Sequence, residues 1–154
     1  MYISSVTYRL CASENSEIIM AVNAFENMSH DECVQLTQSI MSILDNWGLA
    51  GEHILSVLNL PKNVRVRALR RYRENTPFPD DSKVYERLEH IIGIADALRT
   101  SYPHNPAMGT LWMRQNNKRF NDRSPLELIV TDGLQGLLEV REHLDCAFDW
   151  HLNP

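Results

Sequence analysis

The residues of this chain that could bind a metal or carry catalysis are its six histidines and three cysteines. The histidines are His30, His53, His90, His104, His143 and His151, and no two of them form an HxxxH or HExxH pair. Zinc sites need several such ligands at short, regular spacings. His143, Asp145 and Cys146 are close in sequence, but positions i, i+2 and i+3 of a helix do not all point the same way. The pattern therefore predicts neither a metal site nor a cysteine nucleophile.

Other motifs typical of enzymes, and signals for export or membrane insertion, are also not seen in the sequence. The sequence has no GxSxG motif, no glycine loop for phosphate and no dinucleotide fingerprint. Cys11, Cys33 and Cys146 lie far apart without a CxxC pair, which is typical of reduced thiols in a reducing compartment. No basic, apolar leader and no run of about 18 apolar residues is visible. We expect a cytoplasmic, non-enzymatic protein that needs no cofactor, no metal and no membrane.

The distribution of charged residues along the chain suggests a binding function. The formal net charge is −5, and residues 1–47 hold one base against six acids. Residues 62–73, KNVRVRALRRYR, hold six bases and no acid. Arginine and lysine neutralise DNA phosphates, and arginine is suited to guanine edges. The candidate DNA-binding residues are Lys62, Asn63, Arg65, Arg67, Arg70, Arg71 and Arg73.

The basic stretch also has a structural interpretation. At 100° per residue, the six bases spread around much of a helix instead of forming one narrow stripe. Some of them would then form a solvated face or pair with the acidic N-terminal third. Both interpretations remain open from the sequence.

The elements that position these residues are predicted to be helices. The start and stop signals favour helices at about 30–46, 50–60, 64–74, 82–100, 105–113 and 134–149, with one more opened by Ser124-Pro125. Ser29 to Glu32 and Ser124 to Glu127 each read as a capping box. The last helix should turn Leu137, Leu138, Val140, Leu144 and Phe148 inward. Residues 2–10 alternate weakly and could form an edge strand or an arm.

Two of these helices suggest a DNA-binding layout. The short helices 50–60 and 64–74 flank a tight turn and lie between longer helices, as in a helix-turn-helix unit. The turn holds Asn59 where such units usually have glycine, and a clear recognition pattern is missing.

Residues 102–150 carry a second set of motifs. They are Trp112 in a helix; Asn117, Phe120 and Arg123-Ser124-Pro125 in a polar loop; Leu126-Glu127; Gly133 and Gly136; and Val140-Arg141 with Leu144. This arrangement resembles the C-terminal toxin-binding domain of the Xre/MbcA/ParS antitoxins, whose polar loop has the form PNxxFGGRSP. Asn116 replaces the proline of that loop, and Asn121 and Asp122 replace its two glycines. Asn and Asp tolerate left-handed backbone well, so the turn should survive.

The resemblance implies an antitoxin of a type II toxin–antitoxin system. Its partner would be a RES-domain toxin that consumes NAD or attaches ADP-ribose to a target, and the antitoxin would act without catalysis. Many members repress their own operon as a homodimer. The implied toxin-binding residues are Asn117, Phe120, Asp122, Arg123, Ser124, Arg141 and Trp150, because aromatic and arginine anchors carry much of interface energy. For Trp112 we favour core packing.

The expected protein is all-α. We predict an N-terminal arm over residues 1–28, a helix-turn-helix-like bundle over 29–80 and a toxin-binding module over 81–154, with a shared core. The alternative function is a stand-alone transcriptional regulator that uses the C-terminal module for dimerisation. A degenerate paralogue that has lost its toxin is a third alternative.

Overall fold

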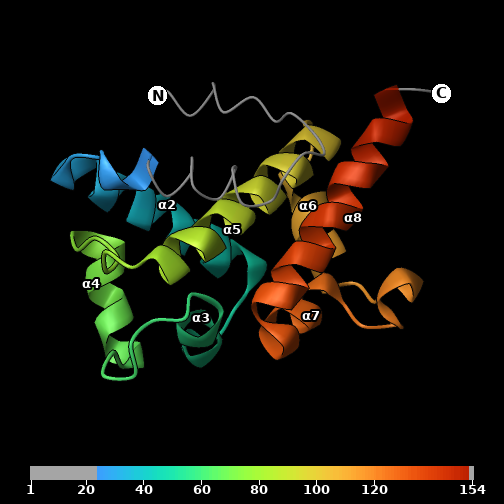
Figure 1. The fold of residues 1–154 in the computed structure, drawn as a ribbon. Helices are drawn as coiled ribbons and strands as arrows, with labels where there is room; N and C mark the ends of the chain where they lie inside the picture. Colours follow the sequence, from blue (N-terminus) through green and yellow to red (C-terminus); the bar gives the residue numbers. More distant parts are fainter. Residues whose placement is uncertain (1–23, 153–154) are drawn as a thin grey trace.

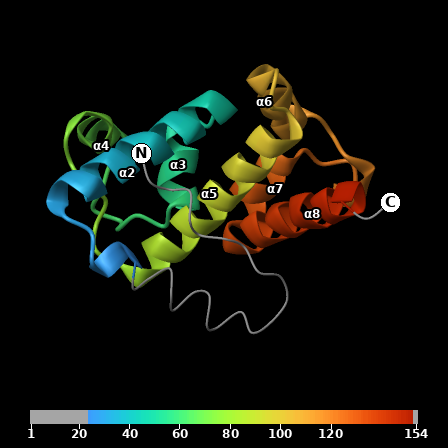
Figure 2. The ribbon, with the colours of Figure 1, turned by 90° about the horizontal axis from the view of Figure 1, so that it is seen from above.

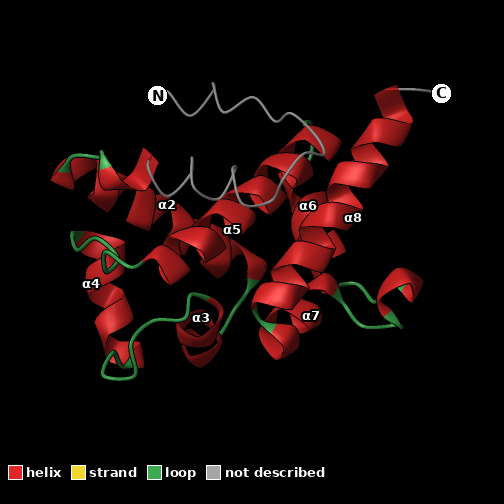
Figure 3. Ribbon diagram, in the orientation of Figure 1, coloured by secondary structure: helices red, strands yellow, loops and turns green. Residues whose placement is uncertain are grey.

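The chain is built from helices, as the sequence predicts. The computed structural model describes residues 24–152, with side chains as far as Cys146, and contains no strand in that range (Figure 3). The long helix α5 (Ser82–Ser101) runs through the middle. On one side of it lie α2 (His30–Trp47), α3 (Gly51–Val57) and α4 (Leu69–Glu74), and on the other α6 (Pro106–Arg114), α7 (Pro125–Asp132) and α8 (Leu134–Leu152) (Figures 1 and 2). The strand or arm expected at residues 2–10 lies outside the described residues.

The start and end of α2 confirm two sequence signals. The Ser29 hydroxyl accepts from the Glu32 amide at 3.3 Å, and the Glu32 carboxylate accepts from the Ser29 amide at 2.7 Å. Both halves of the capping box are therefore present, and two amides at the helix start are satisfied. The helix ends at Gly48, whose φ of 84° is left-handed and suits a residue without a Cβ.

The two short helices are shorter than predicted. α3 ends at Val57 because Asn59 turns left-handed with a φ of 53°, and the Leu60 amide then donates to the Leu55 carbonyl at 3.1 Å. The predicted helix over 64–74 is wrong at its beginning. Arg65 has an extended backbone, the 3-10 turn η1 (Val66–Ala68) follows, and α4 begins only at Leu69.

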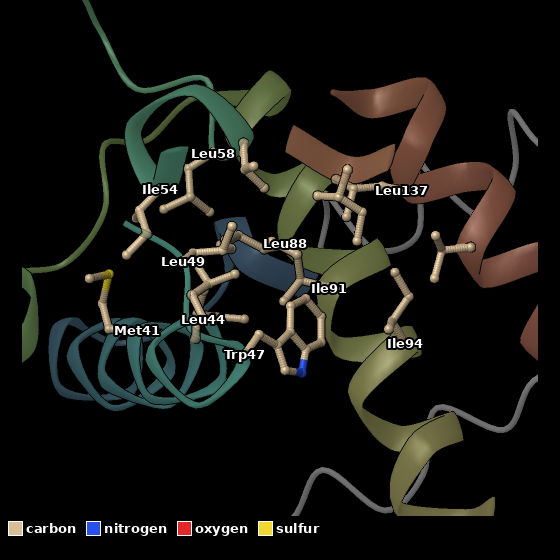
Figure 4. Packing of buried hydrophobic residues seen from close by; sticks show 14 of the residues in the cluster. Met41, Leu44, Trp47, Leu49, Ile54, Leu58, Leu88, Ile91, Ile94 and Leu137 are labelled. Atoms are coloured by element: carbon tan, nitrogen blue, oxygen red, sulfur yellow. The ribbon is translucent and has the colours of Figure 1, made fainter. Parts of the chain in front are cut away.

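One apolar core joins both halves of the chain, as expected. Leu44 and Trp47 from α2, Leu88 from α5 and Leu137 from α8 are all buried in it (Figure 4). α2 also packs against α6, and α3 against α7. Because burial of each large aliphatic side chain contributes about 1.5–3 kcal/mol, this shared core couples the folding of the two halves. The division at residue 80 remains a prediction.

The inward face of α8 differs from the prediction at one residue. Leu137, Val140 and Leu144 are buried as expected, but Leu138 is exposed. The side chain of Phe148 lies outside the described residues. Residues 137 and 138 point about 100° apart around a helix, so both cannot face the same neighbour.

Gly136 allows the close packing of α8 on α7. A Cβ placed on Gly136 would overlap the carbonyl oxygen of Leu128, which is backbone and cannot rotate away. We expect Gly136→Ala to destabilise the chain by about 2–4 kcal/mol, because the two helices must separate. Urea unfolding should show this loss, while Ala at the exposed neighbour Gln135 should change stability by less than about 0.5 kcal/mol. Equal stability of the two variants would contradict the tight contact.

Candidate functional site

The polar loop between α6 and α7, residues 115–124, is an ordered structure with its own hydrogen bonds. The Asn117 carbonyl accepts from the amides of Phe120 at 2.9 Å and Asp122 at 3.1 Å. The Asn117 amide donates to the Arg123 carbonyl at 3.1 Å, and its side chain accepts from the Arg119 amide at 2.9 Å. Asn117 therefore closes the loop from both its backbone and its side chain. A single short turn, η2 (Lys118–Phe120), lies inside it.

Two residues of this loop have left-handed backbone. The φ of Asn121 is 56° and that of Asp122 is 61°. These are the positions where the resembling loop has glycines, and the prediction that Asn and Asp preserve the turn is confirmed. Both side chains are exposed.

The end of the loop is held by α7. The Ser124 hydroxyl accepts from the Glu127 amide at 3.1 Å, and Pro125 occupies the first turn. The other half of the predicted capping box, a hydrogen bond from the Ser124 amide to the Glu127 carboxylate, is not formed in the described structure. Arg123 is instead tied to Asp132 at the far end of α7, with Nη2 and Oδ2 3.2 Å apart. Ser124 is buried and Arg123 half-buried.

Phe120 points into the molecule. Only 6% of its surface is exposed, and its ring meets the ring of His143 edge-on at 5.3 Å between centroids. Trp112 from α6 stacks on the same histidine at 5.9 Å and is half-buried, in agreement with the core role expected for it. Phe120 is thus positioned to hold the loop, and direct contact of its ring with a partner remains a prediction.

Arg141 lies between α5 and α8. Its Nη1 donates to Nδ1 of His90 at 2.9 Å, and its guanidinium is 3.7 Å from Glu89 and 3.8 Å from Asp145. A Cβ at Gly93 would lie 2.7 Å from Nε of Arg141, so the glycine makes room for this side chain. With 14% of its side chain exposed, Arg141 joins two helices in the described structure.

His90 is a buried histidine with a perturbed acidity. Burial lowers its pKa to about 4, and the charges of Arg141 and Arg87 act in the same direction. The guanidinium can only donate, so Nδ1 accepts and the ring is neutral with its proton on Nε2.

Acid should therefore destabilise the chain through His90. Unfolded histidine binds a proton near pH 6.5, whereas the folded residue resists protonation down to about pH 4. The contribution is present above pH 6.5 and is lost as the pH falls from 6.5 to 4, by at most about 3 kcal/mol. We expect His90→Gln, which still offers an acceptor to Arg141, to flatten this part of the pH dependence in urea titrations at pH 7 and pH 4.5. Parallel pH curves for the two proteins would contradict this origin.

The exposed apolar face of α6 was not anticipated from the sequence. Met108 is 41% exposed and Leu111 is 45% exposed, and they lie one turn apart. Gly109 and Met113 are buried on the opposite side of the helix. Because the helix sequence PAMGTLWM is apolar on most sides and holds a single polar side chain, Thr110, its pattern could not tell which side faces solvent.

The basic segment 62–73 divides into paired and open side chains. Arg73 forms two hydrogen bonds with Asp45, at 2.8 and 2.7 Å, and Arg70 pairs with Glu74 at 2.8 Å. Arg73 therefore fits the structural interpretation, pairing with the acidic N-terminal third. Four further bases are exposed and form no ion pair within the described part of the chain; they are Lys62, Arg65, Arg67 and Arg71.

These open bases line shallow hollows of the surface. One hollow, of about 440 Å³, is bounded by Asn63, Arg65, Arg67, Arg70 and Arg71. A neighbouring one, of about 570 Å³, reaches Lys62 and the exposed Val66. A concave surface rich in arginine attracts anions.

Among the side chains that the structure describes, residues 24–146, no group of three histidine, cysteine or acidic residues could hold a metal ion. No helix within residues 24–152 is long and apolar enough to cross a membrane. The described structure provides an ordered polar loop between α6 and α7, attached at its end to α7.

Comparison with known families matches the segment that contains this loop. Residues 97–146 match the family model of the antitoxin Xre/MbcA/ParS C-terminal toxin-binding domain. The match runs from the end of α5 through α6, the polar loop and α7 into α8, and it confirms the resemblance seen in the sequence over this segment. No curated protein matches the chain.

Proposed function

We propose that this chain is a cytoplasmic antitoxin of a type II system that binds and neutralises a RES-domain toxin. Such a toxin consumes NAD or transfers ADP-ribose, and the antitoxin acts by covering it, without catalysis of its own. The observation that supports this proposal is the ordered loop 115–124, which lies entirely within the segment that matches a toxin-binding domain.

The proposed contact surface has an apolar part and a polar part. Met108 and Leu111 form the apolar part on α6, and the loop that follows α6 supplies the exposed Asn121 and Asp122. Interfaces commonly combine an apolar centre with a polar rim, which suits this combination. Arg123 lies at the end of the loop with 33% of its side chain exposed, and we propose that this part reaches the partner.

Three of the contact residues predicted from the sequence are buried or nearly buried and not exposed on the surface. Phe120 and Ser124 are buried and Arg141 is nearly so, and we propose that they act by holding the loop and α8 in place. Asn117 does the same through its hydrogen bonds. The side chain of Trp150 lies outside the described residues, and its toxin contact remains a prediction.

The test is co-expression with the protein encoded next to this chain. We expect a stable complex in affinity purification and restored growth of cells that make the neighbouring protein. A toxic neighbour that is neither bound nor neutralised would refute the antitoxin function, and the stand-alone regulator would then be the better hypothesis.

A second role, binding of operator DNA by a homodimer, is favoured by one observation. The four open bases Lys62, Arg65, Arg67 and Arg71 border two neighbouring shallow hollows on the same segment. Light scattering at micromolar concentration should give the mass of two chains, and a monomer mass would contradict dimerisation.

A further inference from the structure

His143 joins three parts of the toxin-binding segment that are separate in sequence. It lies on α8, its ring is nearly parallel to that of Trp112 on α6, with 7° between the planes, and it meets Phe120 of the loop at 72°. Face-to-face and edge-on geometries are both favourable for aromatic rings. The two contacts converge on one imidazole, so α6, the loop and α8 are linked through a single side chain.

This link attaches the loop to α8. Its internal hydrogen bonds close the turn between Asn117 and Arg123, but they do not join it to α8. Phe120 is its buried apolar side chain, and that ring contacts His143. At its end the loop is held by the Ser124 cap and by the Arg123–Asp132 pair, both on α7.

The state of the imidazole suits such a role. Burial lowers the pKa of His143, and the nearby charge of Arg119 acts in the same direction. The ring is therefore neutral near pH 7 and can pack as a flat aromatic group. In the described part of the chain the ring of His143 contacts Trp112 and Phe120, which indicates a role in packing.

We infer that His143 is a positioning residue for partner binding: its contacts with Trp112 and Phe120 keep the loop 115–124 in the shape that it presents to the toxin. This inference rests on the proposed function. It assigns the imidazole no contact with the toxin itself.

Hydrogen exchange on the full chain tests the first half of this inference without any ligand. The amides of Phe120, Asp122 and Arg123 donate within the loop and should exchange slowly in the wild type. We expect His143→Ala to speed their exchange about tenfold, by loss of two ring contacts. Amides in the middle of α5 should be unaffected. His143→Phe keeps a flat ring and should restore slow exchange, and Ala at the exposed neighbour Glu142 is the matched control.

Capture of the neighbouring gene's protein tests the second half. We expect His143→Ala to weaken capture about tenfold and His143→Phe to restore it. Unchanged exchange in the loop, or equal acceleration throughout the chain without rescue by phenylalanine, would overturn the inference. So would a loosened loop with undiminished capture. If even the wild-type chain captures nothing, the proposed function fails, and the exchange data still decide whether His143 fixes the loop.

Discussion

Leu111→Asp should abolish neutralisation of the toxin while leaving the fold intact. Leu111 is 45% exposed, so an aspartate there faces solvent in the free chain and is tolerated. In a complex the same carboxylate would be buried against the partner without a matching charge. Loss of an apolar anchor at an interface centre commonly costs about 2–4 kcal/mol, and burial of an unpaired charge adds to this. We expect capture of the toxin to weaken at least about 100-fold.

Val66→Asp is the matched control for this experiment. Val66 is also an exposed apolar residue, at 43%, but it lies outside the segment that matches the toxin-binding domain. Growth rescue and titration of the purified complex should separate the two variants, and Met108→Asp should behave like Leu111→Asp. If Leu111→Asp and Val66→Asp neutralise the toxin equally well, the exposed face of α6 takes no part in binding.

Removal of the open arginines should weaken DNA binding far more than removal of the paired ones. Each phosphate contact contributes about −0.9 to the slope of log affinity against log salt, so the four open bases predict a slope of about −3.6 for each chain bound to the DNA. The double variant Arg67→Gln with Arg71→Gln should reduce that slope by about 2 units for each bound chain, as two contacts per chain are lost. Fluorescence anisotropy with the DNA upstream of the gene, between 50 and 200 mM salt, measures the slope.

The control removes the same amount of charge from the same segment. In Arg70→Gln with Arg73→Gln, the two lost cations are those already neutralised by Glu74 and Asp45. Exposed ion pairs contribute at most about 1 kcal/mol each, so this variant should fold. Its salt slope should remain close to that of the wild type. Equal slopes for both double variants would show that the charge pairing does not select the DNA-contacting arginines.

The helices could be predicted from the sequence because their ends carry local signals. Ser29 with Glu32, Gly48, and Ser124 with Pro125 act within a few residues of themselves, and each begins or ends a helix where expected. The left-handed turn at Asn121 and Asp122 is local in the same sense. The start of α4 was predicted too early. Arg65 is extended and a 3-10 turn follows it, although the residue types of this stretch favour a helix.

The division of the basic segment could not be predicted, because it depends on contacts across the fold. Arg73 is paired only because α4 packs beside α2 and brings Asp45 within reach. Arg67 and Arg71 have the same side chain and lie within a few residues of it, yet they remain open to solvent. From the sequence, all six bases were candidates for DNA binding, and it could not say which would form ion pairs. The packing of the helices decides which of them are paired.

The sequence by itself determined that the chain is all-α, where the helices with clear capping signals begin and end, and which antitoxin domain residues 102–150 resemble, since these follow from short-range patterns. Tertiary structure alone decided that Leu111 faces solvent, that Arg141 is enclosed beside His90, and that Phe120 and Trp112 meet on His143. These outcomes depend on which helix covers which face. The arrangement of the helices depends on the burial of apolar surface over the whole core, so it cannot be read from any single segment.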